Sequence, residues 1–226
     1  MGKSIFYLHG FASSPKSTKA AYLGERFRRH GLALRCPDFN RPDFATLTMT
    51  RMLAQLDREM AEIGTRPATL IGSSLGGTVA ILAAAAFGAR VDRLVLLAPA
   101  VRLNSVGSGF SRIGPPEGGP HGSFDRIDEW RRLGRLPFFH YADNVERMLN
   151  FEFYEDSFRY NPFDAAFPQP TLIFQGTKDT SVDPRTVEAF ARVRPNVTLS
   201  LLEDNHQLTN SLPRIWDGIS AFLEVK

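Results

Sequence analysis

Apolar and polar positions along the chain follow two alternating patterns, which together predict a repeated order of strand and helix. Six short, mainly apolar runs are typical of strands buried in a sheet: residues 4–9, 32–36, 68–71, 94–98, 171–175 and 197–202. Five segments have the composition or the three-and-four spacing of helices: residues 16–30, 47–63, 78–87, 186–193 and 213–223. Because strand and helix alternate, we predict an α/β fold with a mostly parallel sheet and helices on both faces.

The alternation is interrupted at residues 101–167, which we interpret as a cap inserted into the sheet domain. Within it we predict a mobile surface loop over residues 107–122, a helix over 123–133, an extended piece over 136–141 and a further helix over 144–154. An insertion after the strand at residues 94–98 lies over the carboxyl ends of the sheet, where open α/β folds bind ligands.

Aromatic residues are dense in the predicted cap, with ten of them between Trp130 and Phe163. We expect the apolar underside of the cap to form a substrate pocket that includes Trp130, Phe138 and Phe139. The alternative is a small satellite core that only covers the sheet.

The segment Gly72-Ser73-Ser74-Leu75-Gly76 joins an apolar strand to an alanine-rich helix and fits the pattern G-x-S-x-G. In this pattern a serine occupies a sharp turn, and glycine is needed two positions before and after it because strand and helix nearly collide. Ser74 is therefore the candidate nucleophile, and the backbone N–H of Leu75 would point at developing negative charge. The alternative is a Gly/Ser turn that merely connects two elements.

An aspartate and a histidine follow later strands in the order that this architecture uses. Asp179 comes after the strand at residues 171–175, and His206 comes after the last strand. Since each of them follows the carboxyl end of a parallel strand, we expect Ser74, Asp179 and His206 to meet at one rim of the sheet. Asp183 is explained by its position before Pro184, as an N-cap.

The first strand runs into His9-Gly10-Phe11, a loop that supplies a second oxyanion N–H in hydrolases of this architecture. We assign that N–H to Phe11. His9 is interpreted as a packing residue that orients the loop by hydrogen bonding, and Ser13, Ser14 and Ser17 as capping residues for the next helix. His30 is interpreted as a helix cap, and His121 and His140 as ordinary surface or cap residues.

Composition narrows the functional classes. A chain of 226 residues with 43% hydrophobic content fits one α/β domain over residues 1–226. A single cysteine, Cys36, allows no intrachain disulfide and is interpreted as a core residue, and no signal-peptide pattern or membrane-length apolar run is present, so we expect a cytoplasmic protein without membrane contact. The net charge of +3 comes from scattered arginines without a basic block, which argues against a nucleic-acid partner.

The elbow Gly72-Ser73-Ser74-Leu75-Gly76-Gly77, residues 7–17, the Gly176-x-x-Asp179 segment and Asn205-His206 resemble the α/β-hydrolase superfamily. More narrowly, they are similar to small bacterial serine esterases of the YqiA-like group. The resemblance implies hydrolysis of a small-molecule carboxylic ester or thioester, without cofactor or metal. The chain departs from the pattern in its larger cap and in Asn205, which replaces the usual glycine. Asparagine can also take a left-handed conformation, so we expect the turn to be kept.

Two other functions share these features. A C–C bond hydrolase or a small peptidase uses the same triad, because the chemistry of the triad does not depend on the leaving group. A non-catalytic binding module could retain the fold, although such a module has no need of all three polar groups at one rim. The acyl length and the oligomeric state are left open by the sequence.

Overall fold

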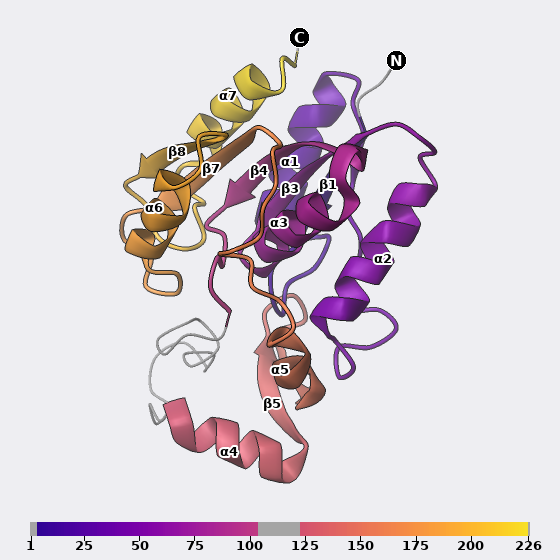
Figure 1. Ribbon diagram of the computed structural model, residues 1–226, viewed down its shortest axis with the longest axis vertical. Coiled ribbons are helices and arrows are strands. Elements are labelled where there is room, and N and C mark those ends of the chain that lie inside the picture. Colours follow the sequence, from indigo (N-terminus) through magenta and orange to yellow (C-terminus); the bar gives the residue numbers. More distant parts are fainter. Residues whose placement is uncertain (1–3, 104–122, 226) are drawn as a thin grey trace.

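The computed structural model describes residues 4–103 and 123–225, which build a six-stranded parallel sheet with helices on both faces and a smaller cap (Figure 1). The strand order is β2–β1–β3–β4–β7–β8. Their bounds are Ser4–Leu8 (β1), Leu34–Arg35 (β2), Ala68–Ser73 (β3), Val91–Leu97 (β4), Thr171–Gly176 (β7) and Val197–Leu202 (β8). All neighbouring strands are parallel, which confirms the predicted sheet, although β2 keeps only two of its five predicted residues.

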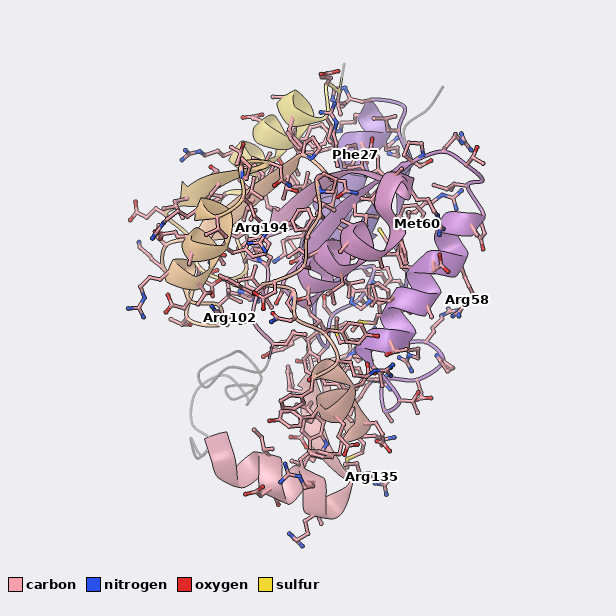
Figure 2. All side chains as sticks on the ribbon, in the orientation of Figure 1. Phe27, Arg58, Met60, Arg102, Arg135 and Arg194 are labelled. Carbon is pink, nitrogen blue, oxygen red and sulfur yellow. The ribbon has the colours of Figure 1, made fainter. Side chains whose placement is uncertain are left out.

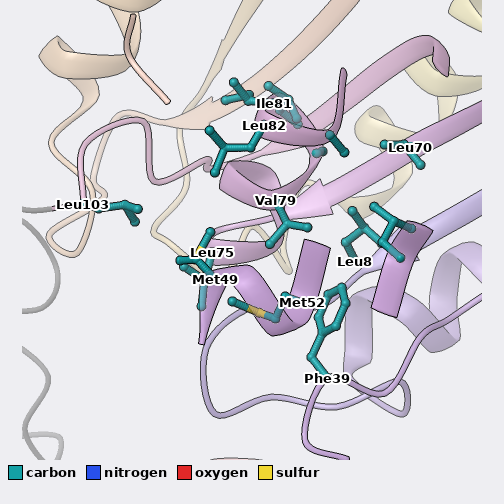
Figure 3. Close-up of a cluster of buried hydrophobic side chains, with 14 of the residues drawn as sticks. Leu8, Phe39, Met49, Met52, Leu70, Leu75, Val79, Ile81, Leu82 and Leu103 are labelled. Carbon is teal, nitrogen blue, oxygen red and sulfur yellow. The ribbon is translucent and has the colours of Figure 1, made fainter. Parts of the chain in front are cut away.

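Helices cover the two faces of the sheet because side chains of each strand alternate. Ile5 and Tyr7 pack against α1 (Thr18–Arg29) and α7 (Leu212–Phe222). Phe6 and Leu8 face α2 (Met49–Ala61), α3 (Leu75–Phe87) and α6 (Pro184–Arg192), and Figure 3 shows part of this second core around Val79. A short 3-10 helix, Gly88–Arg90, follows α3.

The helices α2 and α3 show how sequence pattern decides burial. In α2, Met60 turns into the core while Arg58 turns outward (Figure 2), as the three-and-four spacing predicts. The helix α3 has 13 residues and is buried along most of its length. Within the part of the chain that the structure describes, no helix combines the length and the apolar character needed to cross a membrane.

Side-chain caps define where two of the predicted helices begin. The hydroxyl of Ser17 accepts a hydrogen bond from the N–H of Ala20 at the start of α1. The carboxylate of Asp183 accepts one from the N–H of Arg185, and Pro184 is the first residue of α6. The capping predictions for Ser17 and Asp183 are confirmed, whereas Ser13 and Ser14 do not cap α1, and the hydroxyl of Ser14 accepts from the N–H of Lys16 before the helix begins.

The cap consists of α4 (Ser123–Leu133), the antiparallel pair β5 (Arg135–His140) and β6 (Val145–Asn150), and α5 (Glu152–Ser157). The predicted helix over residues 144–154 is wrong, because Asn144 with φ of 55° ends a tight turn and β6 then pairs with β5. Of the predicted range 144–154, only residues 152–154, the first residues of α5, are helical. The loop predicted over residues 107–122 lies outside the described residues, as does His121.

Contacts between the cap and the loops of the sheet domain hold the cap at the carboxyl edge of the sheet. The ring of Phe11 lies 5.8 Å from that of Phe138 and 5.6 Å from that of Phe153, measured between centroids. The N–H of Asn150 donates to the carbonyl of Ala45 over 2.9 Å. These contacts place the described part of the cap against the loops that follow β1 and β2.

The connection between β3 and α3 brings three backbones into contact. A Cβ added at Gly72 would lie 2.4 Å from the carbonyl oxygen of Gly76, and one added at Gly76 would lie 2.0 Å from the carbonyl oxygen of Leu8 in β1. Both distances are shorter than any van der Waals contact. Glycine at these two positions is therefore required by the crossing of β1, β3 and α3.

We predict that Gly76→Ala lowers the free energy of unfolding by about 3 kcal/mol or more, because the added methyl group meets a backbone carbonyl that cannot rotate away. The matched control is Gly24→Ala in α1, where an added Cβ meets nothing within 4 Å. This control is expected to raise stability by up to about 1 kcal/mol, since alanine favours helix over glycine. Urea unfolding measures both values, and a Gly76→Ala protein as stable as the wild type would contradict the close crossing.

Candidate active site

Ser74 occupies the turn between β3 and α3 in a strained conformation, with φ of 53° and ψ of −116°. Its N–H donates to the carbonyl of Leu97 over 3.0 Å, and its carbonyl accepts from the N–H of Ala100 over 3.1 Å. These bonds to the end of β4 hold a backbone that would otherwise relax. The side chain of Ser74 is partly exposed at the carboxyl edge of the sheet.

The structure brings Ser74, Asp179 and His206 together from three separate loops. Nε2 of His206 lies 3.1 Å from Oγ of Ser74, and Nδ1 lies 2.8 Å from Oδ2 of Asp179. Because an ionised carboxylate only accepts, Nδ1 carries the proton in this arrangement, and Nε2 is left to accept from the hydroxyl. The three residues predicted for one rim therefore form a continuous hydrogen-bonded line.

Asp179 is held in its ionised form although its side chain has no exposed surface. Burial alone would raise its pKa, but the hydrogen bond from His206 and its electrostatic attraction, together with the N–H of Val182 and the amide of Gln175, outweigh burial and hold the pKa below its usual value. The N–H of Ser181 also donates to the carboxylate, over 2.8 Å. The carboxylate is thus oriented as well as charged.

Gln175 is a site residue that sequence reasoning missed. It is fully buried near the end of β7, and its Nε2 donates to Oδ2 of Asp179 over 3.0 Å. The signal available in the sequence was a polar residue at the end of an apolar strand, four positions before the aspartate.

His9 orients the loop after β1, as interpreted from the sequence. Its Nε2 accepts a hydrogen bond from the N–H of Phe39 over 3.1 Å, so Nδ1 carries the proton and donates to the carbonyl of Gly10 over 2.9 Å. Burial lowers the pKa of His9, which keeps the ring neutral. The histidine is therefore a structural support for the loop.

The two residues predicted to supply oxyanion N–H groups lie on either side of Ser74. Leu75 is the first residue of α3, where the backbone N–H has no partner within the helix. Phe11 follows Gly10, whose added Cβ would lie 3.3 Å from Cβ of Ser74, so this loop runs directly beside the serine. The helix dipole of α3 also favours negative charge at this point.

A cleft with a volume of about 1770 Å³ opens over Ser74 and His206. Its walls come from the loop after β1, from residues 38–44, from the turn between β5 and β6 in the cap, and from the loops after β7 and β8. Aromatic and aliphatic parts are supplied by Phe11, Phe44, Leu75, Tyr141 and Val182, and charged groups by Lys16, Lys19, Asp38, Arg41, Asp43, Arg102, Asp143 and Arg147.

The predicted pocket residues Trp130, Phe138 and Phe139 are not among the described residues that line this cleft. Trp130 and Phe138 are buried against each other, with ring centroids 4.9 Å apart, and Phe139 packs on Tyr141 at 5.2 Å. The alternation of β5 explains the correction, because it turns Phe138 into the core of the cap and Phe139 to the opposite side. Trp130 and Phe138 only pack the cap, as the alternative holds, but their core is continuous with that of Phe6 and Leu8 and is not a separate satellite.

His140 belongs to the cap, as expected, but it is buried and links the cap to the loop after β1. Its Nε2 lies 3.2 Å from Oδ1 of Asn40, whose Nδ2 donates to the carbonyl of Ser13 over 2.8 Å. Burial lowers the pKa of His140 below its ordinary value. This bridge fixes one wall of the cleft.

The turn that carries His206 is built differently from the expectation. Asn205 does not take the left-handed conformation; positive φ in this loop falls on Leu208, at 56°. The side chain of Asn205 instead accepts from the N–H of Gln207 over 2.9 Å, and the carboxylate of Asp204 accepts from the N–H of Ser211. Side-chain acceptors thus replace the turn that glycine would make.

The thiol of Cys36 is poorly suited to act as a nucleophile. Burial raises the pKa of Cys36 to about 11, so its thiol is protonated at neutral pH, in agreement with a packing role. Among residues 4–103 and 123–225, no three His, Cys, Asp or Glu side chains gather as a metal site would require.

Solved structures of α/β hydrolases superpose on nearly the whole chain. Est1E from Butyrivibrio proteoclasticus with ferulic acid bound is 20% identical, with a TM-score of 0.78 over 99% of this chain and 89% of its own. Mouse alpha/beta hydrolase domain-containing protein 10 is 19% identical (TM-score 0.76, 99% and 91%). Monoacylglycerol lipase from Paleococcus ferrophilus is 16% identical (TM-score 0.73, 99% and 96%). These similarities show that the chain has the α/β-hydrolase fold.

The model of an uncharacterised protein family, UPF0227, matches residues 4–224. The match includes the cap as well as the loops that carry Ser74, Asp179 and His206. No curated protein matches the chain.

Proposed function

We propose that this chain, which belongs to the uncharacterised protein family UPF0227 over residues 4–224, is a serine hydrolase, and the proposal is drawn from its site. The substrates we propose are carboxylic esters or thioesters with small to medium acyl chains. One observation carries the proposal: the carboxylate of Asp179, the imidazole of His206 and the hydroxyl of Ser74 are hydrogen-bonded in line, over 2.8 and 3.1 Å, beside an open cleft.

In the proposed acylation, Oγ of Ser74 attacks the acyl carbonyl carbon while Nε2 of His206 takes the hydroxyl proton. Asp179 holds the proton on Nδ1 and stabilises the imidazolium. The N–H groups of Leu75 and Phe11 are proposed to stabilise the oxyanion. His206 then gives its proton to the departing alcohol or thiol, and water hydrolyses the acyl-enzyme by the same route.

Ser74→Ala is expected to fold normally and to lose turnover by about a millionfold, because the members of a triad act as a unit. The assay is hydrolysis of p-nitrophenyl butyrate, and a fluorophosphonate probe should label the wild type at Ser74 but not the variant. Retention of more than about a tenth of the wild-type rate would show that Ser74 is not the nucleophile. An unlabelled wild type would favour the non-catalytic binding module.

Asp179→Asn is expected to lower turnover about ten-thousandfold, because an amide stabilises the wrong imidazole tautomer. Asp183→Asn is the matched control four residues away, and it should change turnover little, since asparagine caps helices as well as aspartate does. Steady-state kinetics of both variants decides the assignment, which is wrong if the control shows the larger loss.

The acyl chain is proposed to contact the apolar part of the cleft, which includes Phe11, Phe44 and Tyr141. Burial of a methylene group contributes about 0.8 kcal/mol, so each added pair of methylenes in contact would raise binding about tenfold. In this proposal an acetyl group gains less contact with these rings than a longer acyl chain does. We therefore expect kcat/KM to rise from acetyl to butyryl and hexanoyl esters.

Two exposed aromatic residues of the cap offer a matched test of this pocket. Tyr141 is 54% exposed and lines the cleft, whereas Phe158 is 58% exposed and does not line it. Tyr141→Ala should reduce the hexanoyl-to-acetyl ratio of kcat/KM by roughly fivefold, if one contact contributes about 1 kcal/mol. Phe158→Ala should leave the ratio unchanged. A flat chain-length profile in the wild type, or equal effects of the two variants, would contradict the proposed pocket.

A further inference from the structure

We propose that Lys19 is a positioning residue, whose ammonium group holds the loop that carries His206 so that the imidazole stays aligned with Ser74. The inference rests on the proposed hydrolase function. It concerns a lysine from α1, an element that contributes none of the three triad residues.

Lys19 bridges two parts of the chain that are distant in sequence. Its Nζ donates a hydrogen bond over 2.9 Å to the carbonyl of Gln207, the residue that directly follows His206. Lys19 is the second residue of α1, and the capping bond of Ser17 fixes the start of that helix. Because the backbone of Lys19 lies in a capped helix and the residue is buried, its ammonium group can hold a loop that has no regular secondary structure.

Two buried carboxylates face the ammonium group. Counted over the whole residue, backbone included, Asp179 is 6% exposed and Asp204 is 3% exposed. Both carboxylates attract the positive charge of Lys19. Within the described residues neither carboxylate forms an ion pair with Lys19 inside 4 Å, so the hydrogen bond to Gln207 is the direct contact. The ammonium thus attracts both carboxylates while its hydrogen bond to Gln207 holds the loop.

Burial of the charged Lys19 lowers the stability of the fold, so stability does not explain why a lysine lies here. Lys19 is only 8% exposed, and desolvation lowers its pKa to about 8 in spite of the two carboxylates. A lysine pKa that is lower in the folded than in the unfolded state reduces stability at neutral pH, and stability rises as the pH increases from the folded to the unfolded pKa. A methionine would fill similar space without this effect, so the charge is better explained by the site than by packing.

Asp179, Asp204 and Tyr7 do not change their ionisation near pH 8. Asp179 and Asp204 both have pKa values lowered below the ordinary range, where hydrogen bonds outweigh burial. Burial raises the pKa of Tyr7 in β1 to about 12, so its hydroxyl stays neutral. His206 lines the same cleft. Loss of the Lys19 proton is therefore the change in this cluster that we expect on the alkaline side of neutrality.

The experiment compares Lys19→Met and Lys19→Arg with Lys178→Met. Lys178 is the matched control, because it adjoins Asp179 but is exposed and pairs with Glu203 over 2.8 Å. We expect Lys19→Met to lower kcat for p-nitrophenyl butyrate by about ten- to a hundredfold with KM within about twofold, which is the signature of an effect on the chemical step. Its Tm should not fall by more than roughly 3 °C. Lys178→Met should match the wild type in kcat and KM.

The pH profile provides a second measurement that does not depend on the methionine variant. Wild-type kcat should decline above a pH of about 8, as the ammonium loses its proton. Lys19→Arg keeps its charge at all accessible pH values, so it should recover part of the activity lost in Lys19→Met and shift the decline to higher pH.

Three outcomes would overturn the proposal for Lys19: an unchanged kcat in Lys19→Met, a raised KM with unchanged kcat, or a wild-type kcat that stays flat from about pH 7 to 10. If Lys19→Met does not fold, the wild-type and Lys19→Arg profiles decide. Fluorophosphonate labelling separates this result from failure of the proposed function. A wild type that is not labelled at Ser74 contradicts the hydrolase proposal itself, whereas normal labelling with equal rates in Lys19→Met contradicts only the role of Lys19.

Discussion

The close crossing of β1, β3 and α3 is the constraint on which the site depends. At Gly76 an added Cβ would lie 2.0 Å from the carbonyl oxygen of Leu8, so the three backbones meet without side chains between them. This crossing places Ser74 in a strained turn, with its hydroxyl at the carboxyl edge of the sheet. The loop that bears Phe11 leaves β1 at the same point, so one contact positions both the serine and a candidate oxyanion donor.

Buried carboxylates organise the other side of the site. Asp179 after β7 and Asp204 after β8 each accept backbone N–H groups of their own loops, which fixes loops that have no regular secondary structure. Asp179 also accepts from His206, and Lys19 holds the residue after that histidine. Hydrogen bonds to charged carboxylates therefore fix the loops after β7 and β8, as close backbone contacts at glycine fix the turn at Ser74. The two parts of the site meet in the 3.1 Å contact between His206 and Ser74.

The sequence by itself determined the α/β order of elements, because burial on both faces of a sheet and on one face of a helix produces periods that can be read locally. It also located Ser74, Asp179 and His206, since each follows the carboxyl end of a strand and parallel strands bring those ends to one edge. The capping roles of Ser17 and Asp183 were equally local. Such features depend on neighbours within a few positions.

Only the tertiary structure decided how the cap is built and what lines the cleft. Residues 145–150 form a strand rather than a helix because β5 lies beside them and supplies hydrogen-bond partners. Of the aromatic residues between Trp130 and Phe163 that the sequence analysis singled out, Tyr141 lines the cleft, while Phe138 is buried in the cap. Lys19 reaches the site through a contact across 188 positions that no sequence spacing indicates, and the partner of the buried Gln175 is decided by the same packing. Periodicity shows whether a side chain is buried, but the partner that it meets depends on how distant segments pack.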